Sequence, residues 1–228
     1  DSLWIKPIKN QVANYRLIFY RSVLTSILFS GIYFLFRYQW LDFGLTYQFV
    51  KLNIDVSRLD VIAIVSLCIV GFFGLYFFTS SLYANKFSFA TPLASSGFVF
   101  TVLVATFLNK STMNTGTMVA FFIFFIAMIF IMKQFTLSDF KLFIFPILLT
   151  HFFWDSAVVF YPMAIQKVGI LLFCLIMELT VCLMAFLFSL INDKGRLIDY
   201  MSIEIRSFGL RIICMAVCIT SALFLLSF

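Results

Sequence analysis

The chain has 228 residues, of which 63% are hydrophobic and only 11% are charged, and its mean hydropathy is +1.09. A soluble domain carries about 25% charged residues, so too little polar surface remains to cover a water-exposed globule, and the composition indicates an integral membrane protein. The net charge of +6 does not indicate nucleic-acid binding, because the basic residues stand at the ends of apolar runs, where Lys and Arg flank a bilayer.

Seven apolar runs are long enough to predict transmembrane helices, since a span needs about 20 apolar residues. In chain order they cover residues 17–37, 60–85, 87–109, 112–132, 142–166, 168–191 and 207–228. The length of these uncharged runs favours helices over the short alternating strands of a barrel. The predicted fold is therefore an all-α, polytopic membrane helix bundle.

Two short matches indicate an internal repeat. The stretch 79-TSSLY-83 in the second segment is similar to 220-TSALF-224 in the seventh, and Trp4 is comparable with Trp154. The two matching segments are five helices apart, so the copies are expected to cross the membrane in opposite directions. Inverted repeats of this kind build many transporters, with the binding site near the midplane between the halves.

The stretch 79–131 also carries a pattern of small residues, turns and helices. Its parts are Ser81-Leu82-Tyr83-Ala84 at the end of a helix, a Pro-Leu turn within 88–93, a helix with Gly97 and Thr101, and Gly116 before a long apolar run. This pattern resembles the EamA repeat of the drug/metabolite transporter superfamily. The earlier piece 16-RLIFYRSVLTSILF-29 resembles the second helix of that repeat, and the resemblance covers roughly residues 1–132.

The resemblance implies a chain organisation and a function. Residues 1–135 would form a first repeat with an incomplete first helix, and 136–228 a second repeat without its last two helices, as an internal portion of a ten-helix chain. Asn109-Lys110 stands where the family often has Gly-Glu, so no role of that Glu is carried over. The family implies a secondary transporter that moves a small organic metabolite by alternating access. It also implies a multi-pass location in the cell membrane, which in bacteria is the inner membrane.

The polar run inside the apolar sequence has a packing and a functional interpretation. Five hydroxyls are expected to bond to carbonyls of their own helices, which satisfies them in lipid: Ser80, Ser81, Ser95, Ser96 and Thr101. The small residues at 94–97 let two backbones approach closely. In the functional interpretation, one face of the third segment lines a water-filled path. Tyr83, Ser96 and Thr101 would there offer hydrogen bonds to a solute.

Ionisable residues inside a span are costly and are therefore candidates for functional sites. His151 and Asp155 lie i,i+4 in the fifth segment, beside Trp154 and between Pro146 and Pro162, two prolines that can kink the helix. An imidazole next to a carboxylate can take up a proton near neutral pH, which would couple transport to protons. The alternative is a structural role, in which the pair is only a hydrogen bond or Asp155 holds a basic residue of the bundle.

A second pair of intramembrane charges is predicted from the alignment of the two halves. Arg21, after Phe19-Tyr20, and Glu178, after Ile176-Met177, occupy related places. An ion pair across the bundle would neutralise both charges in a low dielectric.

The search for catalytic motifs finds none. The sequence has no Gly-rich phosphate loop, HExxH, CxxC or nucleophile elbow, so we expect no enzyme and no cofactor, with a membrane enzyme that acts on lipids as the alternative. The five cysteines lie in apolar runs without zinc spacing, so no metal site is predicted: Cys68, Cys174, Cys182, Cys214 and Cys218. The expected partners are the lipid bilayer and a small-molecule solute, with protons and a homodimer left open. The alternative function is a non-transporting membrane protein, either a receptor or a lipid-handling subunit.

Overall fold

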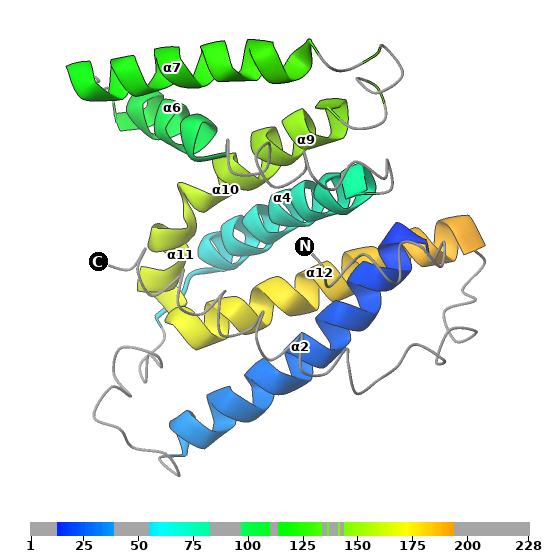
Figure 1. Ribbon diagram of the computed structural model, residues 1–228. Helices are drawn as coiled ribbons and strands as arrows, with labels where there is room; N and C mark the ends of the chain where they lie inside the picture. The colour runs from blue at the N-terminus through cyan, green and yellow to red at the C-terminus, as the bar shows by residue number, and fades with distance from the viewer. Residues whose placement is uncertain are drawn as a thin grey trace. The chain divides into compact units, whose positions relative to one another are not determined.

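The computed structural model describes residues 13–38, 55–82, 97–109, 114–133, 136, 141 and 144–193. The elements of the described residues are helices (Figure 1): α2 Asn14–Arg37, α4 Arg58–Leu82, α6 Gly97–Asn109, α7 Thr115–Met132, α9 Phe145–Thr150, the π-helix η2 His151–Asp155, α10 Ser156–Val158, α11 Tyr161–Val168 and α12 Ile170–Asp193. The predicted all-α fold is therefore confirmed for this part of the chain.

Three of these helices, α2, α4 and α12, are long and apolar enough to cross a membrane. The segments from α9 to α11 make a fourth candidate if they are counted as one broken span, and α6 and α7 contain shorter apolar stretches. The described residues thus carry the helices of a multi-pass membrane protein. The predicted segment 207–228 lies outside the described residues, so the inverted relation of the second and seventh spans stays a prediction.

The chain divides into two compact units, which do not follow the predicted repeat boundary at residue 135. Unit 1 covers residues 73–159 and holds the C-terminal part of α4 together with α6, α7, α9, η2 and α10. Unit 2 contains the described residues on either side, namely α2, the N-terminal part of α4, α11 and α12. The division of the chain into two repeats stays a prediction.

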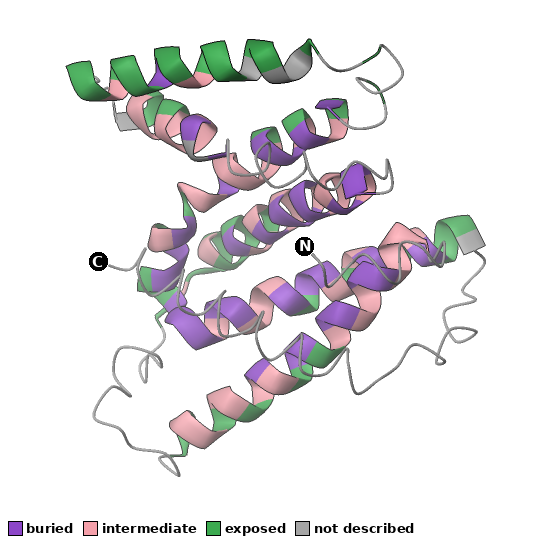
Figure 2. Cartoon of the chain, viewed as in Figure 1, coloured by how far each residue is buried: buried purple, intermediate pink, exposed green. Residues whose placement is uncertain are grey.

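In unit 2, α2 packs along α12 through one face. The buried residues of α2 recur every three or four positions, which places them on one side of a helix: Leu17, Ile18, Arg21, Ser22, Thr25, Ser26 and Phe29. Small serines at this face let the two backbones approach closely, whereas Leu24, Ile27 and Phe34 are exposed. Figure 2 shows this alternation of buried and exposed strips along both helices. Polar residues therefore lie in the helix contact, and large apolar side chains face outward toward lipid.

In unit 1, α4 makes a very close approach to the π-helix. A Cβ atom added at Gly74 would lie 2.7 Å from Trp154 Cβ and 2.9 Å from the Trp154 backbone nitrogen. The Phe153 ring packs against Phe73 and Phe77, with centroids 5.7 and 5.8 Å apart. The absence of a side chain at Gly74 is therefore what lets α4 contact η2 backbone to backbone.

Candidate functional site

The fifth predicted segment is not one continuous helix, because the chain bends by 41° between Val158 and Tyr161, next to one of the two prolines that the sequence places around the ionisable pair. Pro146 and Pro162 each lie in the first turn of a new helix, α9 and α11, where the missing N–H has no partner to lose. Proline also cannot donate to the carbonyl four residues earlier, which is why the helix that contains Val158 stops before Pro162. The two prolines thus bound a segment that carries both predicted ionisable residues.

Between these prolines the backbone widens into the π-helix His151–Asp155. Such a turn places one extra residue in the helix and occurs frequently at functional sites. The extra residue changes the direction in which the following side chains point. The π-helix therefore orients the residues from His151 to Asp155, for which the sequence predicted an ordinary α-helix.

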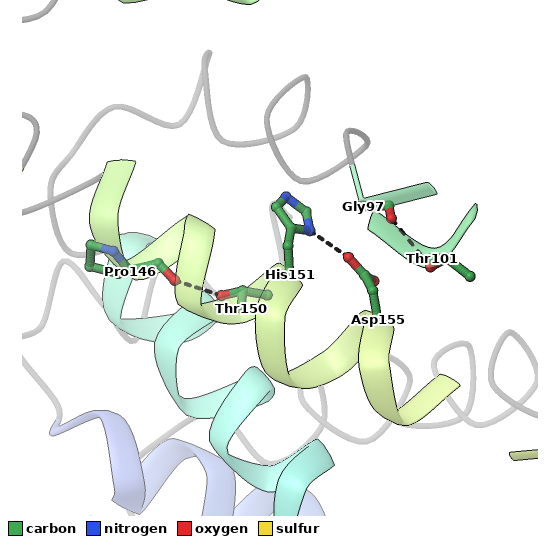
Figure 3. Close-up of polar contacts among 6 residues, drawn as sticks. All are labelled: Gly97, Thr101, Pro146, Thr150, His151 and Asp155. Atoms are coloured by element: carbon green, nitrogen blue, oxygen red, sulfur yellow. Dashed lines mark hydrogen bonds and ion pairs between the residues drawn. The ribbon is translucent and has the colours of Figure 1, made fainter. Parts of the chain in front are cut away.

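His151 and Asp155 form a buried polar pair (Figure 3). His151 Nδ1 lies 2.8 Å from Asp155 Oδ2, and the two side chains are 3% and 14% exposed. The imidazole also stacks on Phe100 of α6, with ring centroids 5.2 Å apart and an interplanar angle of 12°. Both side chains are thus enclosed within unit 1.

Gly97, the first residue of α6, lies directly against this pair. A Cβ atom added at Gly97 would be 2.7 Å from Asp155 Oδ2 and 2.8 Å from His151 Nδ1. Only a glycine leaves the carboxylate and the imidazole in their observed positions. The sequence predicts only a packing role for Gly97, and nothing in it distinguishes Phe100 among 33 phenylalanines.

Thr101 lies one turn further along α6, on the side toward Asp155 in Figure 3. Its Oγ1 donates to the carbonyl of Gly97 at 3.2 Å. Ser80 and Ser81 donate in the same way to carbonyls four and three residues earlier in α4. The prediction of internal bonding is confirmed for these three hydroxyls. Thr101 Oγ1 keeps lone pairs that can accept a further hydrogen bond.

The remaining residues that the sequence predicted to line the solute path do not lie beside the His151–Asp155 pair in the described part of the chain. Trp154 is half-buried against Gly74 rather than beside the polar pair. Tyr83 and Ser96 lie outside the described residues, as does Ser95. Of the predicted path residues, the structure therefore brings His151, Asp155 and Thr101 together.

Arg21 and Glu178 meet in unit 2, as the alignment of the two halves predicted. Arg21 Nη2 donates to Glu178 Oε1, and the side chains are 4% and 0% exposed. Within the described part of the chain, Arg21 Nε and Nη1 and Glu178 Oε2 have no hydrogen-bond partner. The pair joins α2 to α12, so it links two helices that are far apart in the sequence.

The apolar helices and the site define a class of protein, namely a multi-pass α-helical membrane protein with a buried His–Asp pair in a π-helix. No group of three His, Cys, Asp or Glu side chains in the described ranges could hold a metal ion. The chain matches no known family model, no curated protein and no solved structure. The resemblance to the EamA repeat stays a prediction that rests on the residues quoted for it.

Proposed function

We propose that this protein is a secondary transporter of the cell membrane, in bacteria the inner membrane, that moves a small organic metabolite by alternating access. His151 and Asp155 form the polar centre of the solute path, and Thr101 contributes a hydroxyl beside them. The exchange of a proton at the pair couples transport to a proton gradient. The observation that carries the proposal is the burial of this ionisable pair in the π-helix between α9 and α10.

The energetics of the pair favour function over structure. An ionisable residue at the centre of a membrane helix costs about 2.5–3.5 kcal/mol on insertion scales. The hydrogen bond between His151 and Asp155 offsets part of this cost. His151 and Asp155 belong to the same π-helix, so their bond joins no separate helices. Apolar side chains of similar volume are often as stable as a buried ionisable pair, so the retention of this pair supports a role in the recognition of a solute or a proton.

The Arg21–Glu178 pair shows the opposite balance. It joins residues 157 positions apart in the sequence, and both partners are fully enclosed between α2 and α12. Loss of either partner would leave a buried charge without its counterion, which is costly. We therefore assign this pair a structural role and do not place it on the solute path.

The proposed coupling follows from the hydrogen bond between the pair. A solute that donates to Asp155 Oδ2 competes with His151 Nδ1 for the same oxygen. Replacement of the His151 bond by a solute bond changes the hydrogen-bond partner of both ionisable groups, which is how solute binding would be coupled to proton exchange at the pair. The π-helix and the break before α11 supply points at which this span can bend.

The test is solute-driven proton flux in proteoliposomes loaded with a pH-sensitive dye. The solutes are a panel of organic cations, amino acids, carboxylates, sugars and nucleosides. The wild-type chain should couple at least one solute to proton movement, and Asp155→Asn and His151→Gln should each lower that flux at least tenfold. Asp55→Asn, which changes an exposed carboxylate outside the helices, should leave it unchanged.

Two results together would contradict the proposal. The wild-type chain would move no solute of the panel, and the wild type and Asp155→Asn would have equal thermal stability in the presence of every solute. That result would favour the alternative, a non-transporting membrane protein such as a receptor or a lipid-handling subunit.

A further inference from the structure

Unit 2 contains a cavity between α4 and α11 that the solute path does not use. Its volume is about 370 Å³, within the range of roughly 300–1,000 Å³ for small-molecule sites. Apolar side chains form most of its walls, among them Ala63, Leu67 and Val70 of α4 and Met163 and Ala164 of α11. The lining thus suits a hydrocarbon chain.

The two ends of this cavity differ in polarity. At one end, Lys167 Nζ lies 3.4 Å from Asp60 Oδ1, and both residues line the cavity. Near the other end, a Cβ atom added at Gly71 would lie 2.9 Å from Tyr161 Oη, so α4 and α11 run antiparallel and nearly touch. The ten residue steps along α4 from Asp60 to Val70 span about 15 Å, which is half of a hydrocarbon core of about 30 Å. The cavity therefore has the length of one leaflet.

At the charged end, Asp60 is held in place mainly by hydrogen bonds with Ser57. Ser57 donates to Asp60 Oδ2 from its backbone nitrogen at 3.0 Å and from its hydroxyl at 2.8 Å, and the Asp60 N–H donates to the Ser57 hydroxyl at 3.2 Å. This reciprocal cap fixes the carboxylate at the start of α4. Lys167 is 52% exposed, and a surface ion pair of this kind contributes little. The Lys167 ammonium, with three donors, is therefore available to an incoming phosphate.

We propose that this cavity is a binding site for a phospholipid with an amino head group. One acyl chain lies along the apolar walls, the phosphate binds Lys167, and the head-group ammonium binds Asp60. We expect the bilayer to supply the ligand, because α4 is long and apolar enough to cross a membrane and charged residues at the start of such a helix lie at the aqueous edge. The order of charge and hydrocarbon along the cavity matches the order along such a lipid.

The experiment is native mass spectrometry of the delipidated full chain titrated with phosphatidylethanolamine. We expect one lipid to bind in preference to further copies. Ala63→Trp, which fills the cavity from an exposed position, and Lys167→Gln should each weaken binding at least tenfold. The matched controls are Ala127→Trp and Lys133→Gln on exposed positions in and just after α7, and these should bind as the wild type does.

Each comparison has a result that overturns the proposal. Equal losses in Ala63→Trp and Ala127→Trp would show non-specific lipid at the protein surface. Equal affinity for phosphatidylglycerol would remove the role of the amino group, and full competition by phosphoethanolamine would show that the acyl chain does not bind. Lys167→Gln with wild-type affinity would remove the phosphate contact. Asp155→Asn should keep full lipid affinity, so loss of transport and loss of this site are separable.

Discussion

A methyl group on residue 97 would occupy space now taken by the functional pair, since its carbon would lie 2.7 Å from Asp155 Oδ2. The contact is with two polar side chains whose mutual bond of 2.8 Å the proposed mechanism requires. At the residue scale, the site therefore depends as much on the missing side chain of Gly97 as on the two ionisable groups.

Gly97→Ala should lower solute-driven proton flux at least tenfold, because the methyl group separates or rotates His151 and Asp155. The measurement is the proteoliposome assay, together with the thermal stability of the purified variant. Gly31→Ala is the matched control, because nothing lies within 4 Å of a Cβ atom added at Gly31. There alanine should stabilise α2 by about 0.5–1 kcal/mol without a change in flux. A Gly97→Ala variant with unchanged flux would place the working site elsewhere.

The Arg21–Glu178 ion pair predicts the stability of two single variants and of the double variant. Arg21→Gln and Glu178→Gln should each destabilise the protein by about 3–5 kcal/mol, since each leaves one buried charge unpaired. The double variant Arg21→Met/Glu178→Leu should regain most of that loss, because no buried charge remains. Equilibrium unfolding in micelles measures all three. A marked difference between the two single variants would count against a shared ion pair.

At the scale of elements, the path of α4 is set by two glycines with unequal neighbours. A Cβ atom added at Gly74 would contact both Cβ and the backbone of Trp154, whereas one added at Gly71 would contact only the hydroxyl at the end of the Tyr161 side chain. A backbone cannot move aside as a phenol group can. The contact between α4 and η2 is therefore far less tolerant of added volume than the contact between α4 and α11.

Gly74→Ala should destabilise unit 1 by about 1–3 kcal/mol, the usual cost of an overpacked contact. Gly71→Ala should cost less, because Tyr161 can turn. Thermal unfolding of both variants in the same detergent gives the comparison. An equal or larger loss for Gly71→Ala would show that the approach of α4 to η2 is not the tighter constraint.

At the scale of the whole molecule, apolar length was enough to predict α2 and α12, whose observed bounds lie within a few residues of the predicted ones. Helical spacing also placed His151 beside Asp155. The π-helix was not predictable, because a widened turn depends on what packs against it, here Gly74 of α4 and Phe100 of α6. The role of Gly97 was hidden for the same reason, since a close approach between distant segments leaves no periodic signal.

Accessibility of Thr101 from the two sides of the membrane tests the account most directly. A Thr101→Cys variant, in a chain whose five cysteines are replaced by alanine, is treated with a membrane-impermeant thiol reagent in sealed vesicles of either orientation. A Thr25→Cys variant in the buried face of α2 serves as the unreactive control. Alternating access at the His151–Asp155 pair predicts that position 101 reacts from both sides. Reaction from one side only, or from neither, would contradict it.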